Sequence, residues 1–275
     1  MFNKKLKRYG LMVLLTVVST SSFAHDPVFG IGPHVVFKDG FEIATDLESD
    51  KRAGNKEQSL SLEVTYGLTG DWSLGADLPY TLNKKLAENN SNGTNDISVF
   101  TKYRFWRQDS LGLQRSAAVL LKMVSDTAAR NKIPRLNKDA TDAILGLTYG
   151  YEGRRWYRWA SARYRYNGSN KTGLNRGDKI LIDFVAGFRP TPTGYLQPDT
   201  VWLLELNGEY TQQDKLSGRD LLNSGGTEWF VSPGIFWTYR YFAIKAGVQI
   251  PVYHALNGLQ KKTDYRARLI FEWHL

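Results

Sequence analysis

Residues 142–151 read DAILGLTYGY, a stretch in which two kinds of side chain alternate. Ala143, Leu145, Leu147, Tyr149 and Tyr151 occupy one set of alternate positions, and Asp142, Gly146, Thr148 and Gly150 occupy the other. Successive side chains of a strand point to opposite faces. The stretch therefore predicts a β-strand with one apolar face and one small or polar face.

The same alternation recurs along the chain from residue 40 onward, for example in AIKAGVQIPV (243–252) and YRARLIFEW (265–273). Each run has at least the 9–11 residues that a tilted strand needs to cross a bilayer. The pattern predicts an all-β fold, a single-chain transmembrane antiparallel β-barrel of about twelve strands. The strands are expected at 40–49, 58–68, 71–82, 95–106, 113–124, 140–152, 155–167, 178–189, 200–212, 226–238, 241–254 and 263–275.

The connections between these strands differ in length and composition. Links after the even-numbered strands are short or turn-like, as at 68–71 and 152–154. Links after the odd-numbered strands are longer and polar, as at 86–95, 125–139, 168–177 and 214–226. Outer-membrane barrels have short periplasmic turns and long extracellular loops. The pattern places both termini on the periplasmic side.

A secreted β-sandwich or lipocalin-like barrel would also show two-faced strands, with its apolar face turned inward. Aromatic residues favour the membrane alternative. Tryptophan and tyrosine stand near the ends of the apolar faces, where interfacial girdles form. The positions are Trp72, Tyr80, Trp202, Tyr210, Trp229, Trp237, Tyr265 and Trp273.

The first 24 residues have the three parts of a secretory signal peptide. Lys4, Lys5, Lys7 and Arg8 precede the apolar run LMVLLTVV (11–18), and SFA (22–24) offers small residues for cleavage. The apolar run is too short for a membrane anchor, which needs about 20 residues. We expect an exported chain that begins at residue 25.

Composition limits the other classes of function. Without residues 1–24, 32 basic residues face 27 acidic ones, so the net charge falls from +9 to +5. The basic residues are spread along strands, which argues against nucleic acid as a partner. The chain has no cysteine, hence no disulfide framework or thiolate chemistry, and its mean hydropathy of −0.39 does not indicate helical spans.

Charged residues on the polar faces are expected to line the lumen. The basic candidates are Lys102, Arg104, Lys122, Arg163, Arg165, Lys245, Arg266 and Arg268. The acidic candidates are Glu42, Asp46, Glu63, Asp77, Asp96, Asp183, Glu205, Glu209 and Glu272. Because the first and last strands meet in a closed barrel, Arg266 and Arg268 are expected to pair with Glu42 and Asp46. Opposed basic and acidic strands would set a field across the lumen.

A twelve-stranded barrel lies between two size classes. Eight strands leave an interior filled by side chains, and sixteen or more leave an aqueous channel. The lumen charges are therefore read in two ways, as a salt-bridged filling or as the lining of a narrow selective pore. A third alternative is an adhesive barrel, but the long loops are rich in Asn, Ser, Lys and Asp and lack an aromatic cluster.

The segment 25–39 lacks clean alternation and contains Gly30 and Gly32. It is expected to lie at the periplasmic mouth or to enter the lumen as a plug. After cleavage, the α-amine and imidazole of His25 would form a chelating pair for Cu(II) or Ni(II), and His34 would add a ligand. Without a cysteine or a carboxylate cluster beside them, an ordinary structural segment is the stronger interpretation, and no resident metal or cofactor is expected.

Catalysis finds little support in the sequence, although some twelve-stranded barrels hydrolyse lipids. Acyl transfer needs a nucleophile, a base and an orienting group. The chain has four histidines, none beside a serine at a recognisable spacing, and no Gly-x-Ser-x-Gly motif. We expect a protein that is not an enzyme.

Several stretches resemble a family of bacterial outer-membrane transporters that includes proteins associated with the meta-cleavage pathway of phenol degradation. They are HDPVFGIGPHVVFKDG (25–40), TYGLTGDWSLGADLPY (65–80), VSPGIFW (231–237) and AGVQIPVYHALNGLQKKTDYRARLIFEW (246–273). The resemblance covers most of the mature chain. It implies a barrel in the cell outer membrane and a transport role for small solutes, including aromatic or charged compounds. The expected partners are outer-membrane lipid, the barrel-assembly machinery and a small-molecule solute.

Overall fold

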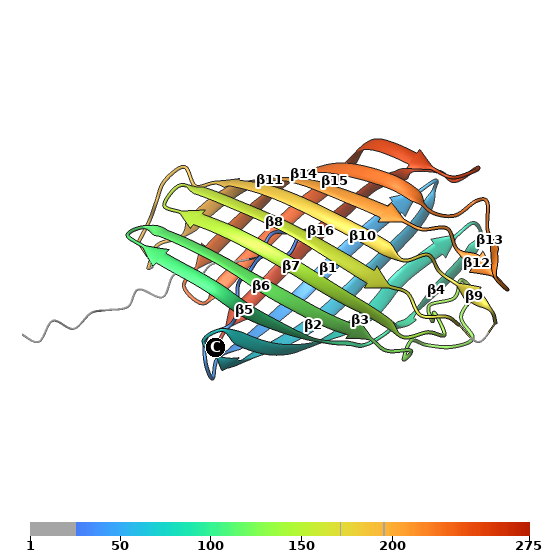
Figure 1. The fold of residues 1–275 in the computed structure, drawn as a ribbon, viewed down its shortest axis with the longest axis horizontal. Coiled ribbons are helices and arrows are strands. Elements are labelled where there is room, and N and C mark those ends of the chain that lie inside the picture. The colour runs from blue at the N-terminus through green and yellow to red at the C-terminus, as the bar shows by residue number, and fades with distance from the viewer. Residues whose placement is uncertain (1–25, 171, 195) are drawn as a thin grey trace, which may run out of the picture.

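The structure is a computed structural model that describes residues 26–170, 172–194 and 196–275. Twelve antiparallel strands close into a barrel whose axis runs along the length of the molecule (Figure 1). The barrel strands are β1 (Phe41–Arg52), β2 (Asn55–Thr69), β3 (Trp72–Leu86), β5 (Ser98–Ser110), β6 (Leu113–Val124), β7 (Asp142–Gly153), β8 (Trp156–Tyr166), β10 (Lys179–Phe188), β11 (Asp199–Thr211), β14 (Gly226–Tyr239), β15 (Phe242–Leu256) and β16 (Thr263–His274).

Closure of the barrel follows from the pairing of its first and last strands. Ala44 on β1 lies opposite Glu272 on β16, and the register continues without interruption from Glu42 to Lys51. Each other barrel strand pairs with its neighbours along the chain, so every barrel strand has two partners. No sheet edge is left open in the membrane, as a bilayer requires. The expected twelve-stranded antiparallel barrel is confirmed.

Side chains alternate between the outside and the inside of the wall. On β11, Leu204 is 55% exposed and Glu205, the next residue, is 1% exposed. The outward positions of β7 are likewise large and exposed, with Leu145 and Leu147 both at 56%. An apolar exterior around a polar interior is the arrangement of a transmembrane barrel. No described segment forms a helix with the length and hydropathy of a membrane span.

The two ends of the barrel differ. The end where β5 meets β6 and β7 meets β8 has two-residue turns at 111–112 and 154–155, and the C-terminus lies at this end (Figure 1). The other end has the longer connections, which contain the short strands β4 (Asn89–Thr94), β9 (Leu174–Asn175), β12 (Lys215–Leu216) and β13 (Arg219–Asp220). We call these the periplasmic and extracellular ends, following the usual loop lengths of such barrels.

One expectation about the loops is wrong. The link after the first strand is a two-residue turn at Ala53 and Gly54, not a long polar loop. Both residues have positive φ, at 51° and 82°, as a tight hairpin turn requires. β1 and β2 therefore stay paired up to Arg52 and Asn55, although their outer parts are polar. Alternation of polarity could not detect strand residues of this kind.

Candidate functional site

The N-terminal segment of the described chain, residues 26–36, lies inside the barrel. Val28 is completely buried in a small apolar cluster. Its neighbours there come from the inward faces of three adjacent strands, namely Trp159 on β8, Val185 on β10, and Val201 and Leu203 on β11. The segment therefore occupies the side of the lumen formed by β8, β10 and β11.

A buried carboxylate binds the backbone of this segment. Glu205 accepts hydrogen bonds from the N–H groups of Val28 at 2.7 Å, Phe29 at 3.2 Å and Gly30 at 3.0 Å. The side chain of Asn207 also donates to it, at 3.3 Å. Hydrogen bonds that involve a charged group are roughly twice as strong as neutral ones. Glu205 is thus a central attachment point of the segment.

Basic residues and a threonine complete the attachment. Lys102 forms an ion pair with Asp26 at 2.5 Å. Carbonyl groups of the segment accept from Arg268 at 2.6 Å (to Val28) and from Thr148 at 2.9 Å (to Ile31). These partners lie on β5, β16 and β7, so the segment is bonded to strands around much of the barrel.

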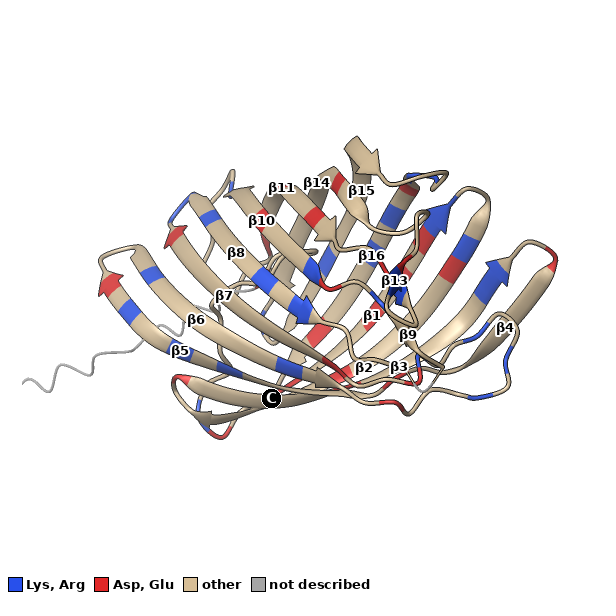
Figure 2. Cartoon of the chain, turned by 45° about the vertical axis from the view of Figure 1, so that its right-hand side comes forward, with Lys and Arg blue, Asp and Glu red and all other residues tan. Residues whose placement is uncertain are grey.

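The other side of the lumen contains a cavity of about 490 Å³. It runs between the N-terminal segment and the inward faces of strands β1, β2, β3, β5 and β6, and residues of β7, β8, β15 and β16 border it. Acidic side chains line it on β1 to β3, basic side chains line it on β5, β6 and β8, and β15 and β16 contribute both kinds. Charged residues can be followed along these strands in Figure 2. Opposed charges of this kind set an electric field across the lumen.

Twelve of the seventeen candidate residues border this cavity. They are Lys102, Lys122, Arg163, Arg165, Lys245, Arg268, Glu42, Asp46, Glu63, Asp77, Asp96 and Glu272. Phe29, Phe100, Leu120 and Ile144 also border it, so the lining is apolar as well as charged. The ring of Phe100 lies under the Lys122 ammonium, 5.7 Å from ring centroid to Nζ.

The other five candidates lie elsewhere in the barrel interior. Arg104 is at the periplasmic end, paired with Asp71. Asp183 and Glu205 lie under the N-terminal segment, where Asp183 accepts from Arg163 and Ser161 at 2.7 Å each. Arg266 and Glu209 form an ion pair at 2.6 Å toward the extracellular end.

The ion pairs between the first and last strands differ in part from those expected. Arg268 pairs with Asp46 at 2.5 Å. Arg266 pairs instead with Asp50, four residues beyond Asp46 on β1, and with Glu209. The partner of Glu42 is His274, and Lys245 pairs with Glu272. The register places Asp50 opposite Arg266 and Glu42 opposite His274. Arg268 lies opposite Glu48 and pairs with Glu48, at 3.2 Å, as well as with Asp46.

Sequence reasoning missed three charged residues of the cavity. Glu48 follows the alternation of β1, so the sequence itself indicates its inward position. Asp26 and Lys138 lie outside the periodic runs, in the N-terminal segment and the loop 125–141, where no strand pattern indicates the direction of a side chain. Their inward positions depend on how these segments fold back into the barrel.

The weak metal candidates can be placed only in part. His25 lies outside the described residues, whereas His34 is half-buried and borders the cavity. Within the described ranges, no group of three or more His, Cys, Asp or Glu side chains is arranged to hold a metal ion.

The chain matches one known protein family over most of its barrel. The family model described as "Putative MetA-pathway of phenol degradation" matches residues 70–254, well over half of the chain. The chain belongs to this family. Its match begins just before β3 and ends near the end of β15, so it includes the basic lining residues of β5, β6 and β8 but not the N-terminal segment, β1, β2 or β16.

Solved structures resemble this family member in fold. The crystal structure of an outer membrane channel from Pseudomonas putida F1 superposes with a TM-score of 0.71 at 11% identity, covering 92% of this chain and 100% of that one. The NanC porin has a TM-score of 0.54 at 10% identity, covering 84% and 100%. No curated protein sequence matches the chain. Together with the apolar exterior, these matches confirm an outer-membrane type of barrel.

Proposed function

We propose that this member of the phenol-degradation family is a narrow channel in the cell outer membrane for small solutes. The main support for this proposal is the charged cavity that lies beside the N-terminal segment. Acidic strands face basic strands across it, so a charged or dipolar solute would be oriented as it passes. The N-terminal segment acts as the constriction, in place of a loop folded in from outside.

The proposed solutes include aromatic compounds that carry a charge or a polar group. The support is the mixed lining, in which Phe100, Leu120 and Ile144 stand beside Lys122 and Arg163. An aromatic ring can contact the apolar residues while its polar group binds a basic one. The description of the family, which names phenol degradation, agrees with this class of solute.

A closed structural barrel is the second candidate. It is favoured by the extensive pairing of the lumen charges, for example Arg268 with Asp46 and Lys245 with Glu272. Paired charges can fill a narrow barrel without leaving a path for solutes. An enzymatic role is not part of the proposal, because the solved barrels of similar fold are an outer membrane channel and a porin.

Conductance in planar bilayers tests the proposal. The mature protein is expected to give small, discrete current steps, and a variant lacking residues 26–36 larger ones, because the lumen widens. A deletion in the exposed β12–β13 hairpin, residues 215–220, is the matched control and should leave the steps unchanged. Absence of current from both the mature protein and the 26–36 deletion, with no solute uptake into liposomes, would establish the closed barrel instead.

A further inference from the structure

Two arginines stand on the outer, lipid-facing side of the barrel near its periplasmic end. Arg115 on β6 and Arg158 on β8 lie on either side of Tyr151 on β7, in one row across the three strands. Both guanidinium groups lie over the Tyr151 ring, with centroid distances of 5.7 Å for Arg115 and 5.5 Å for Arg158. They are therefore within about 11 Å of each other, by the sum of these distances.

Neither cation has an anionic partner in the described parts of the chain. Arg115 and Arg158 form no ion pair there, whereas the lumen arginines Arg163, Arg266 and Arg268 all do. The nearest candidate in sequence, Glu152, points into the barrel and accepts from Trp159. Unpaired arginines on a membrane-embedded surface are costly unless an anion reaches them. At this depth the abundant anions are lipid phosphates.

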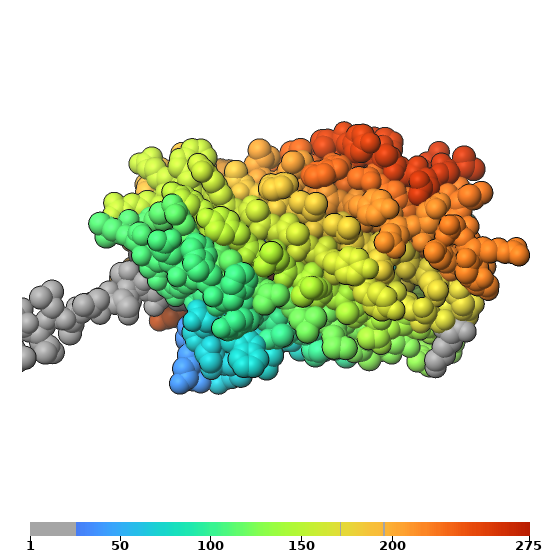
Figure 3. Space-filling model, viewed as in Figure 1, coloured from blue at the N-terminus to red at the C-terminus, as the bar shows by residue number. Residues whose placement is uncertain are grey.

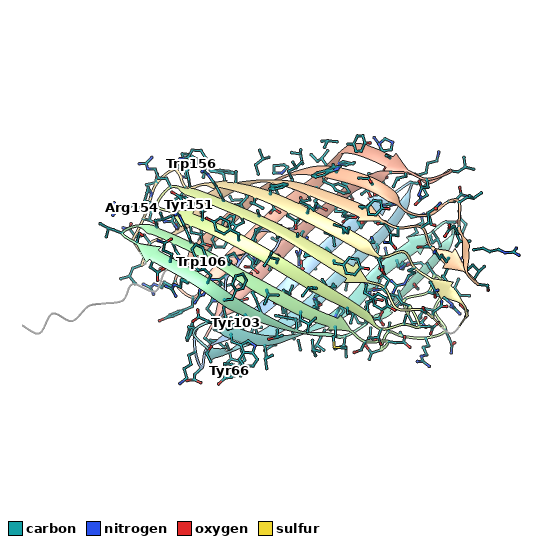
Figure 4. The ribbon with its side chains drawn as sticks, viewed as in Figure 1. Tyr66, Tyr103, Trp106, Tyr151, Arg154 and Trp156 are labelled. Carbon is teal, nitrogen blue, oxygen red and sulfur yellow. The ribbon has the colours of Figure 1, made fainter. Side chains whose placement is uncertain are left out.

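An aromatic band fixes the depth of these arginines in the membrane. Figure 4 shows Tyr103, Trp106, Tyr151 and Trp156 directed outward along the periplasmic end of the wall. Tryptophan and tyrosine on the outside of a barrel mark the level of the lipid headgroups. Arg115 and Arg158 lie within this band, so their guanidinium groups are at the level of phosphates.

An apolar groove of about 610 Å³ on the wall begins at Arg158. Its floor contains the small residues Ala160 and Ala186, and the larger Tyr149, Phe184, Leu204 and Leu206 surround them. Ala160 lies between Tyr149 and Phe184 in one row across the strands. The groove thus runs from Arg158 across β8, β10 and β11 and reaches Val231 on β14. Figure 3 shows this face of the barrel, formed by β5 to β11.

We propose that the groove and the two arginines bind one anionic phospholipid of the periplasmic leaflet. The phosphate lies between Arg115 and Arg158 above the edge of Tyr151, and one acyl chain lies in the groove over Ala160 and Ala186. Arginine suits this role because its planar guanidinium donates two parallel hydrogen bonds to phosphate oxygens. The groove holds the chain close to the wall, so the lipid is retained longer than its neighbours.

A second copy of the chain is a less suitable occupant. A symmetric contact would place Arg115 and Arg158 of both copies against each other, and like charges repel in such an interface. Cation–π contacts with Tyr151 would account for the positions of the two arginines, but they would not account for the groove beside them. The lipid accounts for both features, the charge and the groove.

Native mass spectrometry of the full mature protein tests the site with phosphatidylglycerol as the probe and phosphatidylcholine of the same acyl chains as the comparison. The mature protein is expected to retain one phosphatidylglycerol in preference to phosphatidylcholine. The double variant Arg115→Gln with Arg158→Gln should lower that preference by at least roughly tenfold. Arg240→Gln is the matched control, because Arg240 also lies over a tyrosine, Tyr239, but not beside this groove.

Ala186→Phe tests the groove separately and keeps both arginines. The added ring should fill the floor of the groove and lower retention of the lipid. A difference in gel migration between heated and unheated samples shows that the barrel is folded. Equal binding of the two lipids by the mature protein, or unchanged preference in the double variant, would overturn the proposal. So would a specific dimer that the double variant abolishes without any change in bound lipid.

Discussion

Glu205 lies on β11 and attaches the N-terminal segment to this strand. Its carboxylate accepts hydrogen bonds from the N–H groups of Val28, Phe29 and Gly30. The alternation of β11 predicts that this side chain points inward. It does not predict the partner, because three successive N–H groups are directed at one carboxylate only after the segment has entered the lumen. A buried backbone donor needs an acceptor, and here the acceptor is an acid rather than another strand.

The variant Glu205→Gln should loosen the N-terminal segment. A neutral amide keeps the volume but weakens the charge-assisted hydrogen bonds, each of which contributes about 1.5–3 kcal/mol. We expect faster proteolysis within residues 26–36 and a larger single-channel current than in the unchanged protein. Limited proteolysis followed by mass spectrometry measures the first effect, and planar bilayers measure the second.

Glu63→Gln is the control for this variant, since Glu63 borders the same cavity but bonds to Thr65 of its own strand. Cleavage within residues 26–36 should stay close to that of the unchanged protein. If Glu205→Gln behaves like Glu63→Gln, the segment is held mainly by Val28 and the other contacts.

The strands themselves were largely predictable from the sequence. Alternation located all twelve barrel strands, with ends within about four residues, because each is apolar outside and polar inside over most of its length. The predicted ends of strands are wrong where the strand no longer alternates between apolar and polar residues. β1 and β2 continue through polar residues as far as the turn at Ala53 and Gly54. β3 continues to Leu86, where it pairs with β4. Hydrogen bonding between strands, unlike polarity, leaves no periodic signal in the sequence.

Leu147→Arg tests the orientation of a strand at mid-membrane. Leu147 lies in the middle of β7 and is 56% exposed on the outside. An arginine facing lipid at the bilayer midplane costs roughly 2–4 kcal/mol, and near the interface about 0–1 kcal/mol. The free energy of unfolding from vesicles should fall by the larger amount, and by the smaller amount in Val252→Arg, near the extracellular end of β15. Equal losses at both positions would contradict the proposed placement of the membrane.

At the scale of the whole molecule, the closed sheet distributes charge unevenly around the lumen. Acidic residues of β1 to β3 face basic residues of β5, β6 and β8 across the cavity, and the strand order of the closed sheet brings these groups together. The sequence predicted most of the lining because those residues belong to alternating runs. It could not predict that the N-terminal segment divides the lumen, which depends on contacts between distant parts of the chain.

Lys138 makes the charge of the extracellular mouth depend on pH. It lies in the loop 125–141, with its Nζ 3.8 Å from Asp96 and 3.9 Å from Asp142. Burial, together with the nearby Arg165, lowers the pKa of Lys138 to about 8, although both carboxylates act in the opposite direction. The ammonium is therefore charged below this pH and neutral above it.

If the channel is open, its preference for anions should fall as the pH rises from 7 to 9, because one positive charge leaves the mouth. Reversal potentials in a salt gradient measure this preference directly. Lys138→Met should remove most of the change and should resemble, at pH 7, the unchanged protein at pH 9. Since ordinary lysines titrate near 10.4, other exposed lysines contribute little in this range. A flat profile in the unchanged protein, or a profile retained in Lys138→Met, would show that this loop does not set the charge of the permeation path.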